Sequence, residues 1–241
     1  QCSHPNIIHF DPIIRTPDFI AIPMDCFEDG SARNLLESQP SFTSGLPEEM
    51  ARDIFFQSAC ALKYLHDQGI WHRDIKPENI LISRANGRVE AVLSDFGFAT
   101  RVQPGITQMS GNYIGTPDYA SPEIHCNISY GAYSDIYALG VTLFVLLTNE
   151  IPIKAPSMDA RNDKTLRKFC NKLFHNLFPY HLLERRGYYM AFDLIKRMCN
   201  PKIDERMTID EVLNHPWVMG AAKTAEESDI SKILFPSYED D

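Results

Sequence analysis

The 241-residue sequence lacks any apolar run near the ~20 residues that a membrane-spanning helix needs. The longest, from Tyr137 to Leu147, contains Gly140 and Thr142 and predicts a buried helix instead. The six cysteines show no paired spacing, which argues against a disulfide framework or a zinc site and favours free thiols in a reducing compartment. An excess of positive charge is also lacking, since the formal net charge is −9. We therefore expect no nucleic-acid and no membrane partner, and a cytoplasmic location with the nucleus as the alternative.

Helical periodicity is the main secondary-structure signal in the sequence. A hydrophobic content of 44% with 23% charged residues is ordinary for a globular chain of this length, so a substantial core is expected. Apolar residues at helical spacing, together with end signals such as Pro47 and Gly69, predict several helices. Thr208 with Glu211 forms a capping box before the last of them. The predicted helical ranges are 33–37, 47–66, 136–148, 163–177, 188–199 and 208–213.

Three polar side chains of different kinds, Asp74, Lys76 and Asn79, lie within six residues of one another. Pro77 stands among them and has no backbone N–H, so this segment is predicted to be a loop and not a helix interior. In such a loop Asp74 is free to accept a proton, and Lys76 is free to neutralise negative charge.

Two short runs rich in β-branched residues follow this loop, at 80–82 and 89–93, and the turn-forming pair Asn86-Gly87 lies between them. This pattern predicts a β-hairpin. The hairpin would bring Asp95 back beside Asn79. A carboxylate and an amide oxygen that converge at a strand end suit Mg²⁺, which prefers oxygen ligands.

Two motifs frame this stretch: His72-Arg73-Asp74 with Asn79, and Asp95-Phe96-Gly97. They resemble the catalytic loop and the metal-binding motif of the protein kinases. The resemblance implies that Asp74 orients a substrate hydroxyl and accepts its proton, and that Lys76 stabilises the γ-phosphate. It also implies that Asn79 and Asp95 hold Mg²⁺ on ATP. Lysine two residues after the aspartate is the pattern of serine/threonine kinases, which act on protein substrates.

A third match runs from Gly115 to Glu123 and resembles the end of the kinase activation segment, with Ser121 where alanine is usual. The resemblance implies that Thr116 hydrogen-bonds to Asp74 and Lys76. The position four before Thr116, a common phosphosite in the family, is Asn112, which cannot be phosphorylated. Loop phosphorylation that pairs with Arg73 is therefore a hypothesis. Its candidate sites are Thr107, Ser110 and Tyr113.

The resemblance continues to the C-terminal helices, which are most like those of the calcium/calmodulin-dependent kinases. It implies that Asp135 binds the backbone of the catalytic loop and that Arg206 pairs with Glu123. Ser134 or Asp135 is expected to cap the long apolar helix. The basic residues between Lys164 and His175 fit either a substrate-docking patch or an ordinary solvated helix face, and the second interpretation is favoured.

At the other end, His4-Pro5-Asn6-Ile7-Ile8 resembles the turn that follows helix C in a kinase small lobe. Two apolar segments, 7–14 and 19–27, fit paired strands of that lobe. By this resemblance Met24 is the gatekeeper, and the backbone of Asp25 and Phe27 meets the adenine of ATP. Leu81 belongs to the same set of nucleotide-binding residues.

These observations predict a mainly α (α+β) protein-kinase-like fold, with a small-lobe remnant at 1–27, the helical large lobe at 28–219 and an acidic tail at 220–241. No Gly-x-Gly-x-x-Gly motif occurs, and neither the strand lysine nor the helix glutamate of the small lobe is found. We therefore expect the natural protein to continue upstream, and the piece alone to be inactive and to expose apolar surface. The alternative is a non-catalytic, pseudokinase-like scaffold. The sequence leaves the oligomeric state open.

Overall fold

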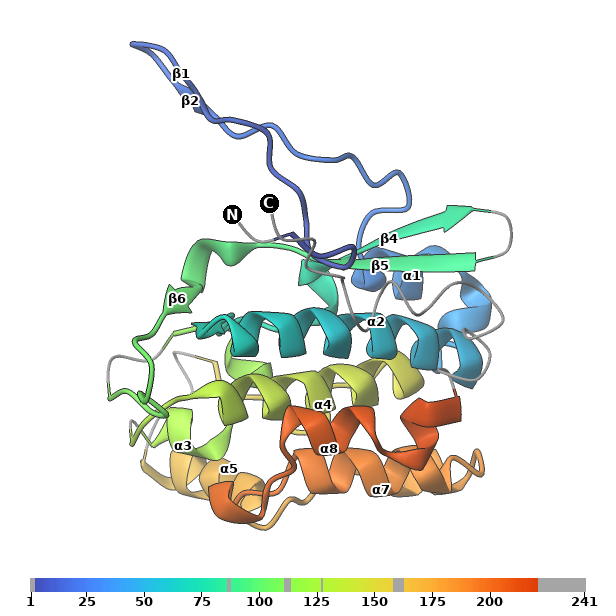
Figure 1. Ribbon diagram of the computed structural model, residues 1–241. Helices are drawn as coiled ribbons and strands as arrows, with labels where there is room; N and C mark the ends of the chain where they lie inside the picture. The colour runs from blue at the N-terminus through green and yellow to red at the C-terminus, as the bar shows by residue number, and fades with distance from the viewer. Residues whose placement is uncertain (1–2, 86–87, 111–113, 127, 158–162, 221–241) are drawn as a thin grey trace.

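The computed structural model describes residues 3–85, 88–110, 114–126, 128–157 and 163–220. Within these residues, helices form one body that carries three two-stranded sheets on its upper side (Figure 1). The helices are α1 (Ala32–Ser38), α2 (Glu48–Asp67), α3 (Pro122–His125), α4 (Ala132–Thr148), α5 (Asp163–Phe174), α6 (His181–Glu184), α7 (Tyr189–Met198) and α8 (Ile209–Leu213). The strands are β1 (Ile14–Arg15), β2 (Ile20–Ala21), β3 (Ile70–Trp71), β4 (Ile80–Ala85), β5 (Arg88–Leu93) and β6 (Thr100–Arg101).

The centre of the body is α4, in which every residue from Ser134 to Thr148 is buried. It packs against α2 on one side and α7 on another, and α8 packs on α2 (Figure 1). A helix enclosed in this way can be apolar all round, as the sequence predicted. Gly140 allows a close approach to α7, because a Cβ there would lie 2.7 Å from the Cys199 Sγ.

The start of α4 differs from the prediction. The helix begins at Ala132, after Gly131, and not after Ser134 or Asp135. The Gly131 N–H donates to the Ser134 hydroxyl oxygen at 3.3 Å. Both polar side chains therefore lie inside the first turn of the helix, and the Asp135 carboxylate is directed to another segment, described below.

Helix α2 supports the catalytic loop that follows it. Glu48 and Glu49 occupy its first turn, where the positive end of the helix dipole favours acids. Pro47 precedes the first helical residue and does not occupy it. Gly69 has φ +65°, a left-handed conformation that ends the helix as predicted. The helix predicted at 33–37 is present as α1, whose N-cap is Ser31, and the predicted Thr208 capping box of α8 is confirmed.

The predicted hairpin is present as β4 and β5, which pair antiparallel with Ile80 opposite Leu93 and Ile82 opposite Ala91. These four side chains are buried, because the hairpin packs on α2. The expected turn at residues 86–87 lies outside the described residues. Strands β3 and β6, which the sequence did not predict, pair with each other through Trp71 and Thr100. Strands of two residues have no periodicity for a sequence to reveal.

The N-terminal strands pair as expected but are much shorter than predicted. Only β1 and β2 form a ladder, and one isolated bridge joins Phe10 to Met24. This hairpin projects away from the helical body (Figure 1). Ile14, Phe19 and Ile20 are therefore exposed, with Ile20 at 63%, which agrees with the expected apolar surface. Long regular strands require cross-strand and face-to-face packing, which is not available to so isolated a ribbon.

No described helix combines the length and the apolar character that a membrane crossing requires. The tail from residue 221 lies outside the described residues, and the division at 27 and 219 stays a prediction.

Candidate active site

Asp135 of α4 binds the backbone of the catalytic-loop segment. The Asp135 carboxylate accepts hydrogen bonds from the backbone N–H of His72 at 2.9 Å and of Arg73 at 2.8 Å. The Oδ2, which accepts from His72, also lies 3.0 Å from the His66 Nε2. Arg73 has φ +69°, an uncommon conformation for a non-glycine residue that these bonds help to maintain. The expected contact between Asp135 and the loop backbone is confirmed.

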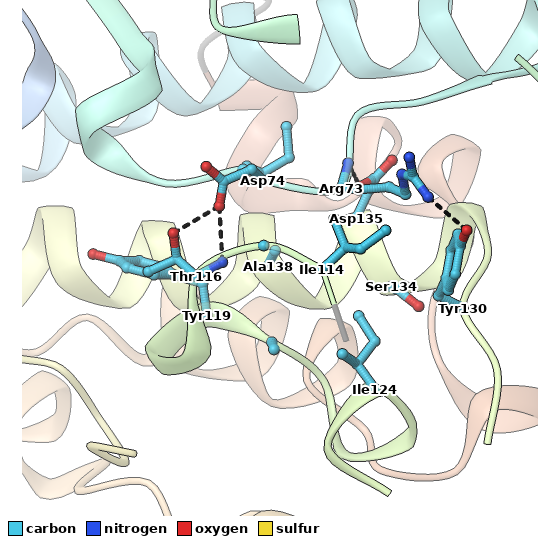
Figure 2. A pocket seen from close by; sticks show the side chains of 13 residues that line it. Arg73, Asp74, Ile114, Thr116, Tyr119, Ile124, Tyr130, Ser134, Asp135 and Ala138 are labelled. Atoms are coloured by element: carbon cyan, nitrogen blue, oxygen red, sulfur yellow. Dashed lines mark hydrogen bonds between the residues drawn. The ribbon is translucent and has the colours of Figure 1, made fainter. Parts of the chain in front are cut away.

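Asp74, Lys76, Thr116 and Asn79 form one hydrogen-bonded cluster, and Figure 2 shows the bonds between Asp74 and Thr116. The Asp74 Oδ1 accepts from the Thr116 N–H at 2.9 Å and from its hydroxyl at 2.7 Å. The Oδ2 accepts from the Lys76 Nζ at 2.7 Å and from the Asn79 Nδ2 at 3.0 Å. Lys76 also donates to the Thr116 hydroxyl at 2.7 Å. The predicted contacts of Thr116 with Asp74 and Lys76 are therefore present.

This cluster keeps the Asp74 carboxyl ionised. Burial alone would raise its pKa, but the hydrogen bonds from Lys76 and Thr116 and the charge of Lys76 outweigh burial, so the pKa lies below its ordinary value. A fixed, ionised carboxylate can orient a substrate hydroxyl. It can also accept the hydroxyl proton while the hydroxyl oxygen forms a new bond.

His72 supports the site from inside the protein. Its side chain is fully buried, and its Nε2 donates to the Ser94 carbonyl oxygen at 2.9 Å. Burial lowers the pKa of the imidazole, so the ring is neutral at pH 7. The Nδ1 accepts from the Asp74 N–H at 3.3 Å, and the ring meets that of Phe96 edge to face. Both ring hydrogen bonds are with backbone groups, so His72 supports the loop.

The end of the hairpin lies beside the loop that carries Asn79. The Ser94 N–H donates to the Asn79 carbonyl oxygen at 2.8 Å, so Asp95 follows directly beside the loop. The Asn79 amide nitrogen donates to Asp74, which leaves the amide oxygen as the atom for a cation. Asp95 is exposed, and one carboxylate oxygen accepts from the Gly97 N–H at 3.2 Å. Two oxygen donors, completed by phosphate and water, fit Mg²⁺.

No group of three or more His, Cys, Asp or Glu side chains positioned to bind a metal occurs within the described ranges.

The predicted adenine-contacting residues lie at the edge of β4. The Gly30 carbonyl oxygen accepts from the Ile82 N–H at 2.8 Å, and Ser31 forms a bridge with Leu81. The segment that carries Asp25 and Phe27 therefore reaches the strand that carries Leu81. Asp25 is exposed, whereas Phe27 and Leu81 are half-buried.

A small pocket lies beside Asp74 and Thr116 (Figure 2). Its lining includes Asp74, Thr116, Tyr119, Tyr130 and Asp135. Asn79, Asp95 and the predicted adenine-contacting residues do not line it. The pocket is therefore distinct from the predicted nucleotide site.

Tyr130 contacts the catalytic loop and was missed by sequence reasoning. Its hydroxyl accepts from the Arg73 guanidinium, which also lies 5.0 Å from the Tyr130 ring centroid (Figure 2). The Arg73 Nε donates to the Phe98 carbonyl oxygen at 2.6 Å. Of the candidate phosphosites, Thr107 and Ser110 are exposed and Tyr113 lies outside the described residues, as does Asn112.

Arg33 was missed as well. From α1 it donates to the Glu78 carboxylate at 2.9 Å and to the Tyr119 hydroxyl at 3.2 Å. It also donates to the Asn149 side-chain oxygen at 3.3 Å. An arginine in a short helix has no sequence signal that marks such a role, because its partners lie 45 to 116 residues away.

Comparison with known proteins identifies the family. The model of the protein kinase domain matches residues 1–218, and the chain belongs to this family. Serine/threonine-protein kinase PEPKR2 of Arabidopsis thaliana is 32% identical over 217 residues, which cover 90% of this chain and 43% of the relative. Calcium/calmodulin-dependent protein kinase type IV of Mus musculus is 30% identical over 92% of this chain and 45% of the relative.

The chain therefore spans less than half the length of these two relatives. A solved structure described as the Rad53 kinase domain and SCD2 has a TM-score of 0.72 at 24% identity. The match covers 90% of this chain and 73% of that one, and it establishes the fold. The protein-kinase fold predicted from the sequence is confirmed.

Proposed function

We propose that this protein is a serine/threonine protein kinase that transfers the γ-phosphoryl group of ATP to Ser or Thr hydroxyls of other proteins. The observation that carries the proposal is the Asp74 carboxylate, held at 2.7 Å from both the Lys76 ammonium and the Thr116 hydroxyl. Membership of the protein kinase family and the names of the relatives support it.

In this reaction a substrate hydroxyl lies beside Asp74, which orients the oxygen and accepts its proton as the oxygen bonds to phosphorus. Lys76 lies next to the same carboxylate and neutralises charge that develops on the transferred phosphoryl group. Because Asp74 and Lys76 are already fixed by Thr116 and Asn79, little reorganisation is needed in the transition state.

Asn79 and Asp95 are the residues that would hold Mg²⁺, which neutralises charge on the ATP phosphates when bound. Their roles rest on the oxygen donors described above. The backbone of Asp25 and Phe27, with Leu81 beneath, would contact adenine. The five cysteines in the described residues are free thiols, which supports a reducing location such as the cytoplasm, with the nucleus as the alternative.

The test uses the complete domain, because the 241-residue piece alone is expected to be inactive, and it separates binding from transfer. ATP binding with Mg²⁺ is measured by calorimetry, and transfer to a mixture of acceptor proteins is measured by mass spectrometry of phospho-Ser and phospho-Thr. Asp95→Ala is expected to weaken Mg·ATP binding, whereas Asp74→Ala is expected to keep binding and lose transfer. Turnover retained by either variant would refute the assigned roles.

The alternative is a non-catalytic protein that uses the same fold as a binding scaffold. The observation that favours it is the apolar surface of the N-terminal hairpin, where Phe19 is 58% and Ile20 is 63% exposed. The same assay decides between the two, since a scaffold would show no transfer under any condition and no dependence on Asp74.

A further inference from the structure

Two thiols lie against each other where the segment after Thr116 meets α5. Cys126 directly follows the last residue of α3, and its side chain is exposed. Cys170 lies within α5 and is half-buried. The Cys126 thiol is within hydrogen-bonding range of the Cys170 thiol. Both are free thiols.

The neighbours of both cysteines hold this approach in place. The rings of His125 and Phe169 meet edge to face, with centroids 4.6 Å apart and an interplanar angle of 86°. Phe169 is buried, so the contact belongs to the packed boundary between α3 and α5. The two elements that carry the cysteines are therefore packed against each other at this point.

Hydrogen bonds connect this boundary between α3 and α5 to the candidate catalytic residues. The His125 Nε2 donates to the Pro117 carbonyl oxygen at 3.0 Å. Pro117 follows Thr116, whose hydroxyl donates to Asp74 at 2.7 Å. A covalent link at Cys126 would therefore restrain the segment that supports Asp74.

We propose that Cys126 and Cys170 form a reversible disulfide under thiol-oxidising conditions, which links α3 covalently to α5. The oxidant is a low-molecular-weight disulfide such as glutathione disulfide. One protein thiolate attacks a glutathione sulfur, the S–S bond of glutathione disulfide breaks and one glutathione thiolate leaves. The second protein thiolate then attacks the mixed disulfide and releases the other glutathione. Two protein thiols thus lose two electrons and two protons, and glutathione disulfide is reduced to two glutathione molecules.

The step should be faster at higher pH. Burial, together with the neighbouring Cys170 thiol, raises the pKa of Cys126, and only the thiolate attacks a disulfide. This site does not depend on phosphoryl transfer, so its test stands apart from that of the proposed function.

The test is peptide mapping of the 241-residue chain after incubation with glutathione disulfide at about pH 8. The protein is alkylated and digested with trypsin without reduction. Cys126 then lies in the peptide 102–154, and Cys170 lies in the four-residue peptide Phe169–Lys172. The expected product is a cross-link between these two peptides in protein that migrates as a monomer, and dithiothreitol removes it. A glutathione adduct without the cross-link, or a cross-link only between two copies, would overturn the proposal.

Two variants test which thiols take part. Cys170→Ser should retain glutathione on Cys126, because no second thiol can displace it. Cys26→Ser, which removes an exposed thiol elsewhere, should leave the cross-link unchanged. Hydrogen exchange supplies a second measurement: amides of the segment 117–126 should exchange more slowly in the oxidised wild type, and not in Cys170→Ser treated alike. Unchanged exchange in cross-linked protein would overturn the claim that the disulfide restrains this segment.

Discussion

Arg206 and Glu123 form a two-point ion pair inside the protein, 83 residues apart in sequence. The Nη1–Oε1 distance is 2.7 Å and the Nη2–Oε2 distance is 2.9 Å, and the side chains are 0% and 3% exposed. Arg206 also donates to the Tyr133 carbonyl oxygen at 2.9 Å. The pair predicted from the kinase resemblance therefore connects the segment before α8 to α3.

Arg206→Ala should destabilise the fold by about 3–5 kcal/mol, because it leaves the Glu123 carboxylate buried without its partner. The measurement is urea unfolding at pH 7. The double variant Arg206→Met with Glu123→Leu should recover much of the lost stability, since no buried charge then remains without a partner. Lys202→Ala, which breaks an exposed pair with Glu205, is the control and should change little. A single variant as stable as wild type would contradict the prediction.

The same pair predicts a pH dependence. Burial alone would raise the pKa of the Glu123 carboxyl, but the hydrogen bonds and charge of Arg206 outweigh burial and lower it. A lowered pKa in the folded state stabilises the fold above the ordinary pKa of glutamate, about 4.3, and this contribution is lost as pH falls through the folded value. The difference in unfolding free energy between wild type and Arg206→Ala should therefore shrink in acid below about pH 4.

Thr116→Val should lower phosphoryl transfer about ten- to one-hundred-fold under the proposed function. Valine has a similar shape but removes the hydroxyl that binds both Asp74 and Lys76, and a hydrogen bond to a charged group contributes about 1.5–3 kcal/mol. Thr116→Ser keeps the hydroxyl and should retain most activity. Steady-state kinetics with fixed ATP test the pair, and equal loss in both variants would show that the methyl group, and not the hydroxyl, matters.

Gly115→Ala should be more harmful than Gly105→Ala. Both glycines have positive φ, +98° and +87°, so an alanine at either costs about 1–2 kcal/mol in backbone strain. At Gly115 the added Cβ would also collide with the Arg73 carbonyl oxygen, whereas nothing lies within 4 Å of the corresponding position at Gly105. Unfolding midpoints and transfer rates of the two variants distinguish backbone strain, which both share, from the steric clash, which is expected only at Gly115. Similar values for the two variants would exclude the clash with the Arg73 carbonyl oxygen.

Asp135→Asn should destabilise the fold by about 2–3 kcal/mol, because an amide nitrogen replaces an oxygen that accepts hydrogen bonds from N–H donors. The amides of His72 and Arg73 should exchange with solvent faster than in wild type. The control is Asp193→Asn, whose side chain is 54% exposed and contacts Arg197 and His215. Exchange of the two loop amides at the wild-type rate would contradict the role of Asp135.

The catalytic loop was predictable because its information is local. Asp74, Lys76 and Asn79 lie within six residues, and a proline among them excludes a helix. The long helices were predictable for the same reason, since their apolar spacing repeats over several turns. Predictions that needed contacts across the chain, such as Thr116 with Asp74 and Arg206 with Glu123, came from the family resemblance and not from periodicity.

Other features had no local signal. The pairing of β3 with β6 involves two residues on each side, and the partners of Arg33 come from three different segments. The length of the N-terminal strands was overestimated, because apolar residues such as Ile14 and Phe19 predict burial only where another element covers them.

By itself, the sequence determined the helical class of the fold, the loop with its acid, lysine and amide, and the kinase family that these motifs resemble. Only the tertiary structure decided which atoms meet Asp74, that Tyr130 holds Arg73, and that Cys126 faces Cys170. The physical reason is that periodicity and turn chemistry act over a few residues. The hydrogen bonds that shape this site join segments that come together only when the core around α4 is packed.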